Sequence, residues 1–162
     1  MKKILTLIIA TSVCVLGCTN TANNSIQNIE LIKKYVQSVE NLDYETMEEI
    51  LDNDYIGYGP SINDSITKTS AVENWKQNVD FLYKSIKYNK SRNAVVIVDS
   101  GKNEGDWVSN WSEVKIVYKE SEKSVTIWAN TIYQIKDNKI VKSYTFYNEA
   151  DVYEQFGFVY SN

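Results

Sequence analysis

The fold is decided by a long C-terminal stretch, WVSNWSEVKIVYKESEKSVTIWANTIYQIKDNKIVKSYTFY, which spans residues 107–147. β-branched and aromatic residues dominate it and polar residues divide it, which is typical of strands joined by short turns. Asp137 and Asn138 predict a two-residue hairpin turn, because Asp and Asn tolerate the positive φ angles that such a turn requires. The expected antiparallel strands are Trp107–Tyr118, Val125–Ile135 and Ile140–Tyr147, preceded by a shorter one at Ala94–Val98.

Helical patterns dominate the chain before this stretch, where apolar residues recur at helical spacing opposite charged ones. Asp43 can cap a short helix, and Ser70 begins a capping box for a longer one. The expected helices are Ile29–Leu42, Asp43–Leu51, Ser70–Leu82 and Glu149–Phe156, with a short strand at Asp54–Tyr58. Helices first and strands afterwards predict the α+β class, with the helices packed on one face of an antiparallel sheet.

The N-terminus predicts export and a lipid anchor. Lys2 and Lys3 precede an apolar run, Ile4–Leu16, that is too short to span a bilayer comfortably. The run ends in Val15-Leu16-Gly17-Cys18, which resembles the bacterial lipobox, whose cysteine carries the lipid. The prediction is a signal peptide at 1–17, lipidation at Cys18, a tether at 18–26 and one domain at 27–162. The protein is thus expected as a lipoprotein of the bacterial cell envelope, on the periplasmic or extracellular side of a membrane; an ordinary secretory signal peptide is the alternative.

Composition narrows the chemistry further. Without residues 1–17, 15 basic residues remain against 21 acidic ones, a formal charge of −6. Nucleic acid is therefore not an expected partner, and membrane attachment is expected through the acyl chains. The sequence contains no histidine, which excludes Ser-His-Asp and Cys-His catalysis and histidine-ligated metals. We expect no metal and no cofactor.

Short motifs punctuate this order of helices and strands: Asn41-Leu42-Asp43, Asp54-Tyr55, Gly59-Pro60 and Asn138-Lys139-Ile140. The whole order, over roughly Ile26–Gly157, resembles the SnoaL-like, nuclear-transport-factor-two-like superfamily. The resemblance implies a strongly bent sheet that wraps around helices into a cone with an internal pocket. It also implies a homodimer formed through the outer face of the sheet.

Ketosteroid isomerase is the best-understood enzyme of this superfamily, and it uses an Asp general base with a Tyr and a protonated Asp as oxyanion hole. The resemblance places Tyr35 at the oxyanion tyrosine. The base, an Asp before a proline, corresponds to Gly59, and the protonated Asp corresponds to Thr131. Without a carboxylate at Gly59, an isomerase of that mechanism is not expected, and no catalytic residue is assigned.

Aromatic and hydroxyl side chains are the candidates for lining the implied pocket, because they suit a flat, mostly apolar molecule with a few polar groups. By strand alternation and the resemblance, Ser143 also faces the pocket, whereas Trp128, Tyr144 and Phe146 face outward. No face is predicted for Trp107 and Trp111, since a single bulge would invert it. The candidate ligand-binding residues are Tyr35, Tyr55, Trp75, Thr131, Tyr133, Thr145 and Tyr147.

Three functional hypotheses follow. The first is a lipid-anchored protein that binds a small, largely apolar ligand in the pocket without catalysis. The second is an enzyme of cyclase, dehydratase or isomerase type that pairs Tyr35 with an unidentified carboxylate. The third is an interaction protein that uses the outer sheet face, through Trp128 and Tyr144, to bind another protein.

Overall fold

A computed structural model describes residues 24–158 of the chain. Residues 24–40 form an N-terminal helix. The other helices are α2 (Tyr44–Ile50), α3 (Lys68–Gln77), a π-helical turn η1 (Asn78–Leu82) and α4 (Glu149–Phe156). The strands are β1 (Leu51–Tyr58), β2 (Ser65–Thr67), β3 (Tyr83–Val98), β4 (Gly105–Tyr118), β5 (Ser124–Lys136) and β6 (Lys139–Tyr147).

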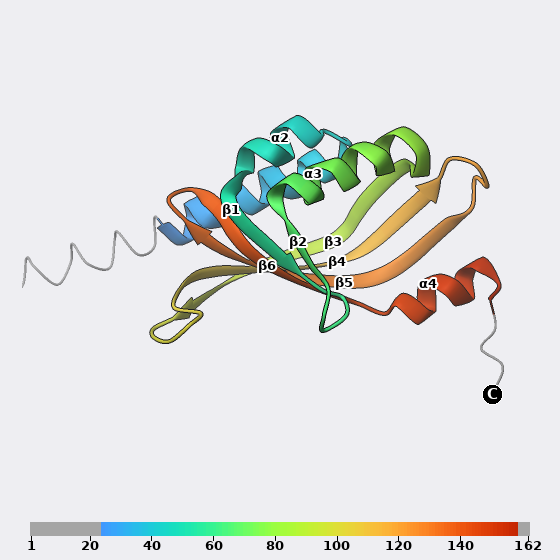
Figure 1. Cartoon of the computed structure of the whole chain (residues 1–162). Coiled ribbons are helices and arrows are strands. Elements are labelled where there is room, and N and C mark those ends of the chain that lie inside the picture. The colour runs from blue at the N-terminus through green and yellow to red at the C-terminus, as the bar shows by residue number, and fades with distance from the viewer. Residues whose placement is uncertain (1–23, 159–162) are drawn as a thin grey trace, which may run out of the picture.

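The strands form one curved sheet in the order β2-β1-β6-β5-β4-β3. Neighbouring strands are antiparallel except β1 and β6, which run parallel. The N-terminal helix, α2 and α3 lie on the concave face, and α4 lies at one end of the sheet (Figure 1). The α+β class and the bent sheet predicted from the sequence are confirmed.

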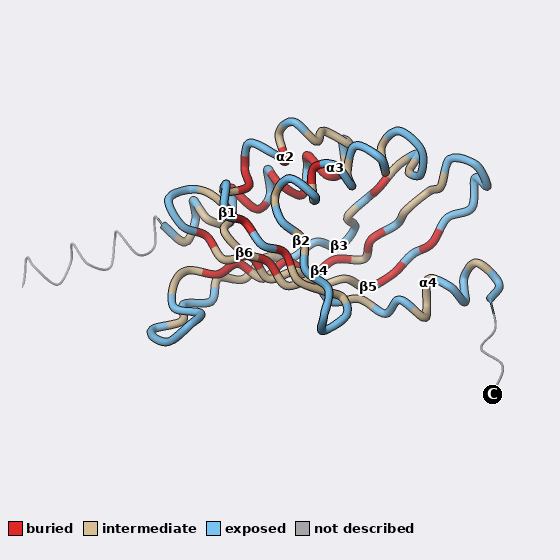
Figure 2. The backbone as a smooth tube through the Cα atoms, viewed as in Figure 1, coloured by how far each residue is buried: buried red, intermediate tan, exposed pale blue. Residues whose placement is uncertain are grey.

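The core lies between the N-terminal helix and the sheet. Ile32 on the helix and Val108 and Ile140 on the sheet are fully buried, at 0% exposure. Figure 2 shows the same pattern, with buried segments along the strands and on the inner sides of the helices. Val36 and Val39 continue the buried side of the N-terminal helix at the predicted spacing.

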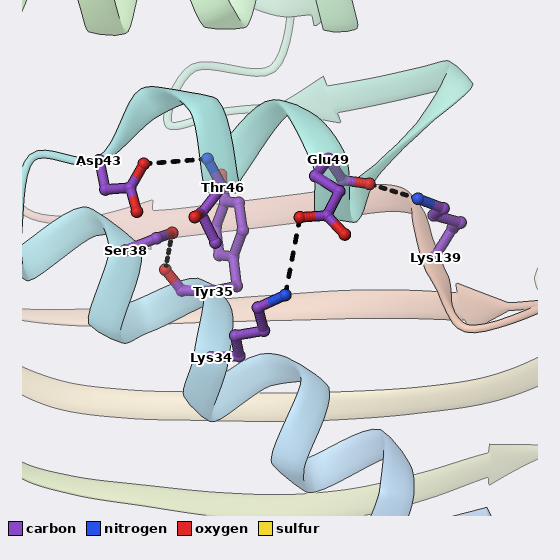
Figure 3. Close-up of polar contacts among 7 residues, drawn as sticks. All are labelled: Lys34, Tyr35, Ser38, Asp43, Thr46, Glu49 and Lys139. Carbon is purple, nitrogen blue, oxygen red and sulfur yellow. Dashed lines mark hydrogen bonds and ion pairs between the residues drawn. The ribbon is translucent and has the colours of Figure 1, made fainter.

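Polar contacts link α2 to the N-terminal helix and to the start of β6 (Figure 3). The Asp43 carboxylate caps α2 by accepting from the Thr46 amide at 3.0 Å. Hydrogen bonding from the Thr46 side chain, and next from the Thr46 amide, lowers the pKa of Asp43. Lys34 lies 3.7 Å from the Glu49 carboxylate, and the Lys139 ammonium donates to the Glu49 carbonyl. The predicted cap at Asp43 is thus confirmed.

Several predicted boundaries differ from the structure. α3 begins at Lys68 and is capped by the Thr67 hydroxyl, which accepts from the Ser70 amide at 3.4 Å, so the Ser70 capping box was placed three residues too late. β3 begins at Tyr83 rather than Ala94. Its first half was missed because lysine and asparagine side chains on its solvent side mask the alternation. The short strand β2 was also missed, within a stretch rich in Ser and Asn.

The tight turns agree with prediction. Asp137 and Asn138 have φ angles of 50° and 59°, as the two-residue hairpin requires. α4 ends at Gly157 in a left-handed conformation, with φ 93°.

The N-terminal predictions are only partly covered by the structure. The signal peptide at 1–17 and the lipidation site Cys18 lie outside the described residues. The predicted tether at 18–26 is helical from residue 24 onward. Within residues 24–158, no helix is long and apolar enough to cross a bilayer.

Candidate functional site

A cavity of about 610 Å³ lies on the concave side of the sheet. Its walls come from α3 and η1, from the concave face of β3 to β6, and from α4. Aromatic rings make up a large part of these walls: Trp75, Tyr83, Tyr88, Tyr118, Tyr147, Tyr153, Phe156 and Phe158. The cavity is therefore mainly an apolar space with hydroxyl groups at its edges.

The floor of the cavity follows from strand alternation. Alternate residues of a strand share one face, so Ile127, Ala129 and Thr131 of β5 all line the cavity. Thr131 pairs with Thr145 of β6, and their hydroxyls lie 3.2 Å apart. Two hydroxyls that already share a hydrogen bond still have acceptor capacity left for a ligand donor.

A chain of aromatic contacts crosses the cavity wall from α3 to α4. The Trp75 and Tyr83 ring centroids lie 6.2 Å apart, those of Tyr83 and Tyr118 5.5 Å, and those of Tyr118 and Phe156 4.9 Å. Edge-to-face pairs of this kind hold rings in fixed orientations. Burial raises the pKa of Tyr83 and of Tyr88 to about 12, so both hydroxyls are protonated donors at neutral pH.

α4 closes one end of the cavity because it is bound to the free edge of β5. The β5–β6 pairing ends at Ala129 opposite Tyr147, which leaves Thr126 beyond it. The Gln155 side chain accepts from the Thr126 amide and donates to the Thr126 carbonyl, both at 2.9 Å. The amide of Gln155 thus replaces the backbone of a neighbouring strand and holds α4 against the cavity.

A partly buried polar cluster, formed by Asn110, Ser91 and Asn93, lies at the other end of the cavity. Asn110 of β4 is 4% exposed, and its amide donates to Ser91 at 2.8 Å and to Asn93 at 2.9 Å. Asn110 and Tyr88 also line a second, smaller cavity of about 250 Å³ under the N-terminal helix. Since its hydrogen bonds are made within the protein, Asn110 is fixed in place as a polar boundary of the large cavity.

The structure brings four of the predicted ligand-binding residues into the cavity wall, namely Trp75, Thr131, Thr145 and Tyr147. It places the other three, Tyr35, Tyr55 and Tyr133, in the buried core rather than in the wall. The Tyr35 and Tyr133 ring centroids lie 5.7 Å apart, edge to face. Tyr133 does lie on the concave face as predicted, but the N-terminal helix covers that part of the face.

Burial also explains the chemistry of this tyrosine cluster. It raises the pKa of Tyr35 and of Tyr133 well above the ordinary value, and the neighbouring tyrosines raise the pKa of Tyr35 further. The Tyr55 hydroxyl lies 2.7 Å from the Ser143 hydroxyl, and both groups are buried. These tyrosines are packed, neutral residues of the core.

Replacing Tyr55 with phenylalanine is expected to lower the free energy of unfolding by about 1–2 kcal/mol, because the buried Ser143 hydroxyl loses its partner. Adding Ser143→Ala should recover part of that loss, since no unpaired hydroxyl then remains. Urea unfolding of the two single variants and the double variant measures this coupling. Strictly additive losses would show that the hydrogen bond contributes nothing.

The outer face of the sheet carries a separate group of aromatic residues. Trp128 and Phe146 are 59% and 53% exposed, which confirms that they face outward. Tyr144 stacks on Tyr58 at 5.0 Å and on Trp107 at 6.0 Å between centroids. Trp107 therefore lies on the outer face. Trp107 and Trp111 are three positions before and one position after Asn110, which lines the cavity, so on a regular strand both side chains point to the opposite, outer face.

Sequence reasoning missed Tyr83 and Tyr88 of β3 and Tyr118 at the end of β4 as wall residues. Tyr88 could have been found from its position two residues after Ile86, since residues two apart share one face of a strand. A bulge between Asn89 and Arg92 interrupts this alternation of apolar and polar residues along β3. Over the part of the chain that the structure describes, no group of three or more His, Cys, Asp or Glu is placed to hold a metal ion.

No protein-family model matches the sequence, and no curated protein matches it. Solved structures do share its fold. A proposed SnoaL-like polyketide cyclase from Shewanella putrefaciens is 13% identical with a TM-score of 0.64, over 81% of this chain and 96% of that one. An LEH-like epoxide hydrolase from M. tuberculosis is 10% identical with a TM-score of 0.59, over 82% and 90%.

A third structure is a hypothetical protein with a ketosteroid isomerase-like fold from Catenulispora acidiphila, solved in complex with trimethylamine. It is 9% identical with a TM-score of 0.62, over 82% of this chain and 98% of that one. Nearly the whole of each structure is covered, although identity is low. The likeness therefore establishes the fold: the chain has the SnoaL-like, nuclear-transport-factor-two-like fold that the order of its elements predicts.

Proposed function

We propose that this protein binds a small, largely apolar molecule in the cavity between α3, the concave sheet face and α4. The observation that carries the proposal is a cavity of about 610 Å³ whose walls are mainly aromatic and aliphatic. Its volume falls within the ~300–1,000 Å³ of typical small-molecule sites, which bury most of the ligand surface. Removing such a ligand from water supplies the main driving force.

Polar groups at the edges of the cavity would orient the ligand. The protonated hydroxyls of Tyr83 and Tyr88 can donate, and Thr131 and Thr145 can accept. A flat molecule with one or two hydroxyl or carbonyl groups suits this arrangement.

The proposal includes the cellular setting predicted from the N-terminal sequence. Lipidation at Cys18 would hold the domain at a membrane of the cell envelope, where apolar molecules concentrate. A homodimer through the outer face would cover the exposed side chains of Trp128 and Phe146. The lipid anchor and the homodimer are each independent of ligand binding in the cavity.

The experiment is an equilibrium titration of the purified protein with N-phenyl-1-naphthylamine, a neutral apolar dye whose emission rises in apolar surroundings. We expect saturable binding of one dye per chain, with a dissociation constant on the order of micromolar. Tyr147→Ala should weaken binding about fivefold or more, because it removes a ring from the wall. Trp128→Ala is the control and should leave the affinity unchanged, since Trp128 lies on the outer face. Loss of dye binding in Trp128→Ala alone would move the site to the outer face.

A second candidate is an enzyme of cyclase, dehydratase or isomerase type that works in the same cavity. Two observations favour it: proteins of this fold include the epoxide hydrolase named above, and the acidic residue Glu149 is among the residues that line the cavity. Glu149 would then be the general base in place of a carboxylate beside Tyr35. Conversion of a bound compound that stops in Glu149→Gln, with binding retained, would establish this candidate.

A further inference from the structure

One position of α4 breaks the apolar character of its cavity side. Glu149, Val152, Tyr153 and Phe156 follow the i, i+3, i+4, i+7 spacing of one helix face, and all four line the cavity. The other three members of this stripe are apolar or aromatic. Glu149 is therefore the charged member of an otherwise apolar stripe, and because its side chain is exposed it lies where the cavity meets solvent.

Aromatic rings surround the end of the cavity where Glu149 lies. Tyr147 precedes it on the same segment, Tyr153 lies one helical turn further along, and Tyr118 contacts Phe156 at 4.9 Å between centroids. Burial raises the pKa of the Tyr147 hydroxyl, and the negative charge of Glu149 raises it further. The carboxylate of Asp64 also raises the pKa of Tyr147, by less than Glu149 does.

The charges nearby leave this carboxylate available. Within residues 24–158, no lysine or arginine forms an ion pair with Glu149. Lys123 lies at the opposite, C-terminal end of α4 from Glu149, where its ammonium donates to the Phe156 carbonyl at 3.4 Å and lies 5.8 Å from the centroid of the Phe156 ring. Lys119 donates to the carbonyls of Val79 and Asp80 in η1. No lysine or arginine is among the described residues that line the cavity.

From this arrangement we infer that the ligand of the cavity is an apolar molecule with a positively charged amino or quaternary ammonium group, which is held at the Glu149 end. This inference rests on the proposed function and adds the charge of the ligand to it. An ammonium group gains from the carboxylate and from the faces of the neighbouring tyrosine rings. An apolar anion meets the same carboxylate with repulsion.

The test is competition for the cavity of the purified protein, with N-phenyl-1-naphthylamine as the bound reporter. The competitors share one alkyl chain: decyltrimethylammonium is cationic, decanol is neutral and decanoate is anionic. We expect decyltrimethylammonium to displace the dye at about tenfold lower concentration than decanoate, with decanol between them. Below the micelle-forming concentration of each compound, the comparison reports binding to the protein.

Variants of α4 test whether the charge of Glu149 causes the preference for the cationic competitor. Glu149→Gln should reduce the cationic preference to about twofold or less, and Glu149→Lys should reverse it in favour of decanoate. Asp151→Asn is the matched control, because Asp151 also lies in the first turn of α4 but does not line the cavity. Its asparagine can still accept the hydrogen bond that Gln155 donates to Asp151 at 3.0 Å.

The outcomes separate this inference from the proposed function. If the dye binds and all three competitors displace it equally, the charge preference is wrong and the apolar cavity stands. If Asp151→Asn loses the preference as fully as Glu149→Gln, the effect belongs to the general charge of α4, and the inference is overturned. If no dye binds in the cavity, the proposed function itself fails.

Discussion

Replacing Gly59 with alanine is expected to lower the free energy of unfolding by about 3 kcal/mol or more, one of the largest effects of any single methyl group in this chain. Gly59 has a φ of 100°, a conformation that residues with a side chain rarely adopt. A Cβ at Gly59 would overlap the backbone carbonyl oxygen of Thr145 on β6. That carbonyl cannot move away easily, because β1 and β6 pair directly beside it, Tyr58 with Tyr144.

The matched control is Gly101→Ala. Gly101 also has a positive φ, 94°, but no atom lies within 4 Å of the position of its Cβ. Its loss should be only the conformational strain, about 1 kcal/mol. Urea unfolding followed by tryptophan fluorescence measures both variants, and equal losses would show that the contact with Thr145 is unimportant.

The position of Gly59 is also relevant to the hypothesis that this protein is an enzyme. The resemblance to ketosteroid isomerase places the general-base aspartate at Gly59. The backbone there leaves no room even for a methyl group, so a Gly59→Asp substitution cannot restore that base without displacing β6. The backbone of β6 therefore leaves no space for a carboxylate side chain at the position that the resemblance assigns to the base.

Replacing Ala129 with tryptophan is expected to weaken binding of N-phenyl-1-naphthylamine by at least about tenfold, which corresponds to about 1.4 kcal/mol. Ala129 lies in the middle of the cavity floor, between Ile127 and Thr131 on the same face of β5. An indole at this position projects into space that is otherwise open to the ligand. The protein should unfold at nearly the same urea concentration as the unchanged chain, because the indole enters a cavity rather than a packed core.

Ala94→Trp provides the control for this variant. Ala94 lies on β3 beside Val95, which packs against the core, so the Ala94 side chain points to the outer face. The same change of side chain there should leave dye binding unaltered. If Ala129→Trp binds the dye as tightly as the unchanged chain, the cavity is not the binding site.

Much of the sheet was predictable because its strands alternate clearly and their turns have strict requirements. Three of the four predicted C-terminal strands match β4, β5 and β6 to within a few residues, and the turn at Asp137 and Asn138 has the expected positive φ angles. β3 was only half recognised. Its polar residues and its bulge between Asn89 and Arg92 remove the regular period on which such a prediction depends.

The sequence predicted which strand residues face the concave side of the sheet, but not how far along the strands the cavity extends. Alternation together with the family resemblance placed Thr131, Thr145 and Tyr147 on the concave face, and all three line the cavity. The same alternation put Tyr133 on that face, yet alternation does not say how far along β5 the N-terminal helix reaches. That position depends on long-range packing around Ile32, which no local pattern records. The cavity consequently lies toward α4, and Tyr35 lies in the core.

The central claim is that the cavity between Trp75 and α4 holds the ligand. A crystal structure of the protein with N-phenyl-1-naphthylamine bound tests it most directly. The account predicts the naphthyl ring above Thr131, with its edge near Tyr147 and α4 closed over it. An ordered dye stacked on Trp128 or Phe146 of the outer face, with the cavity free of dye, would contradict it.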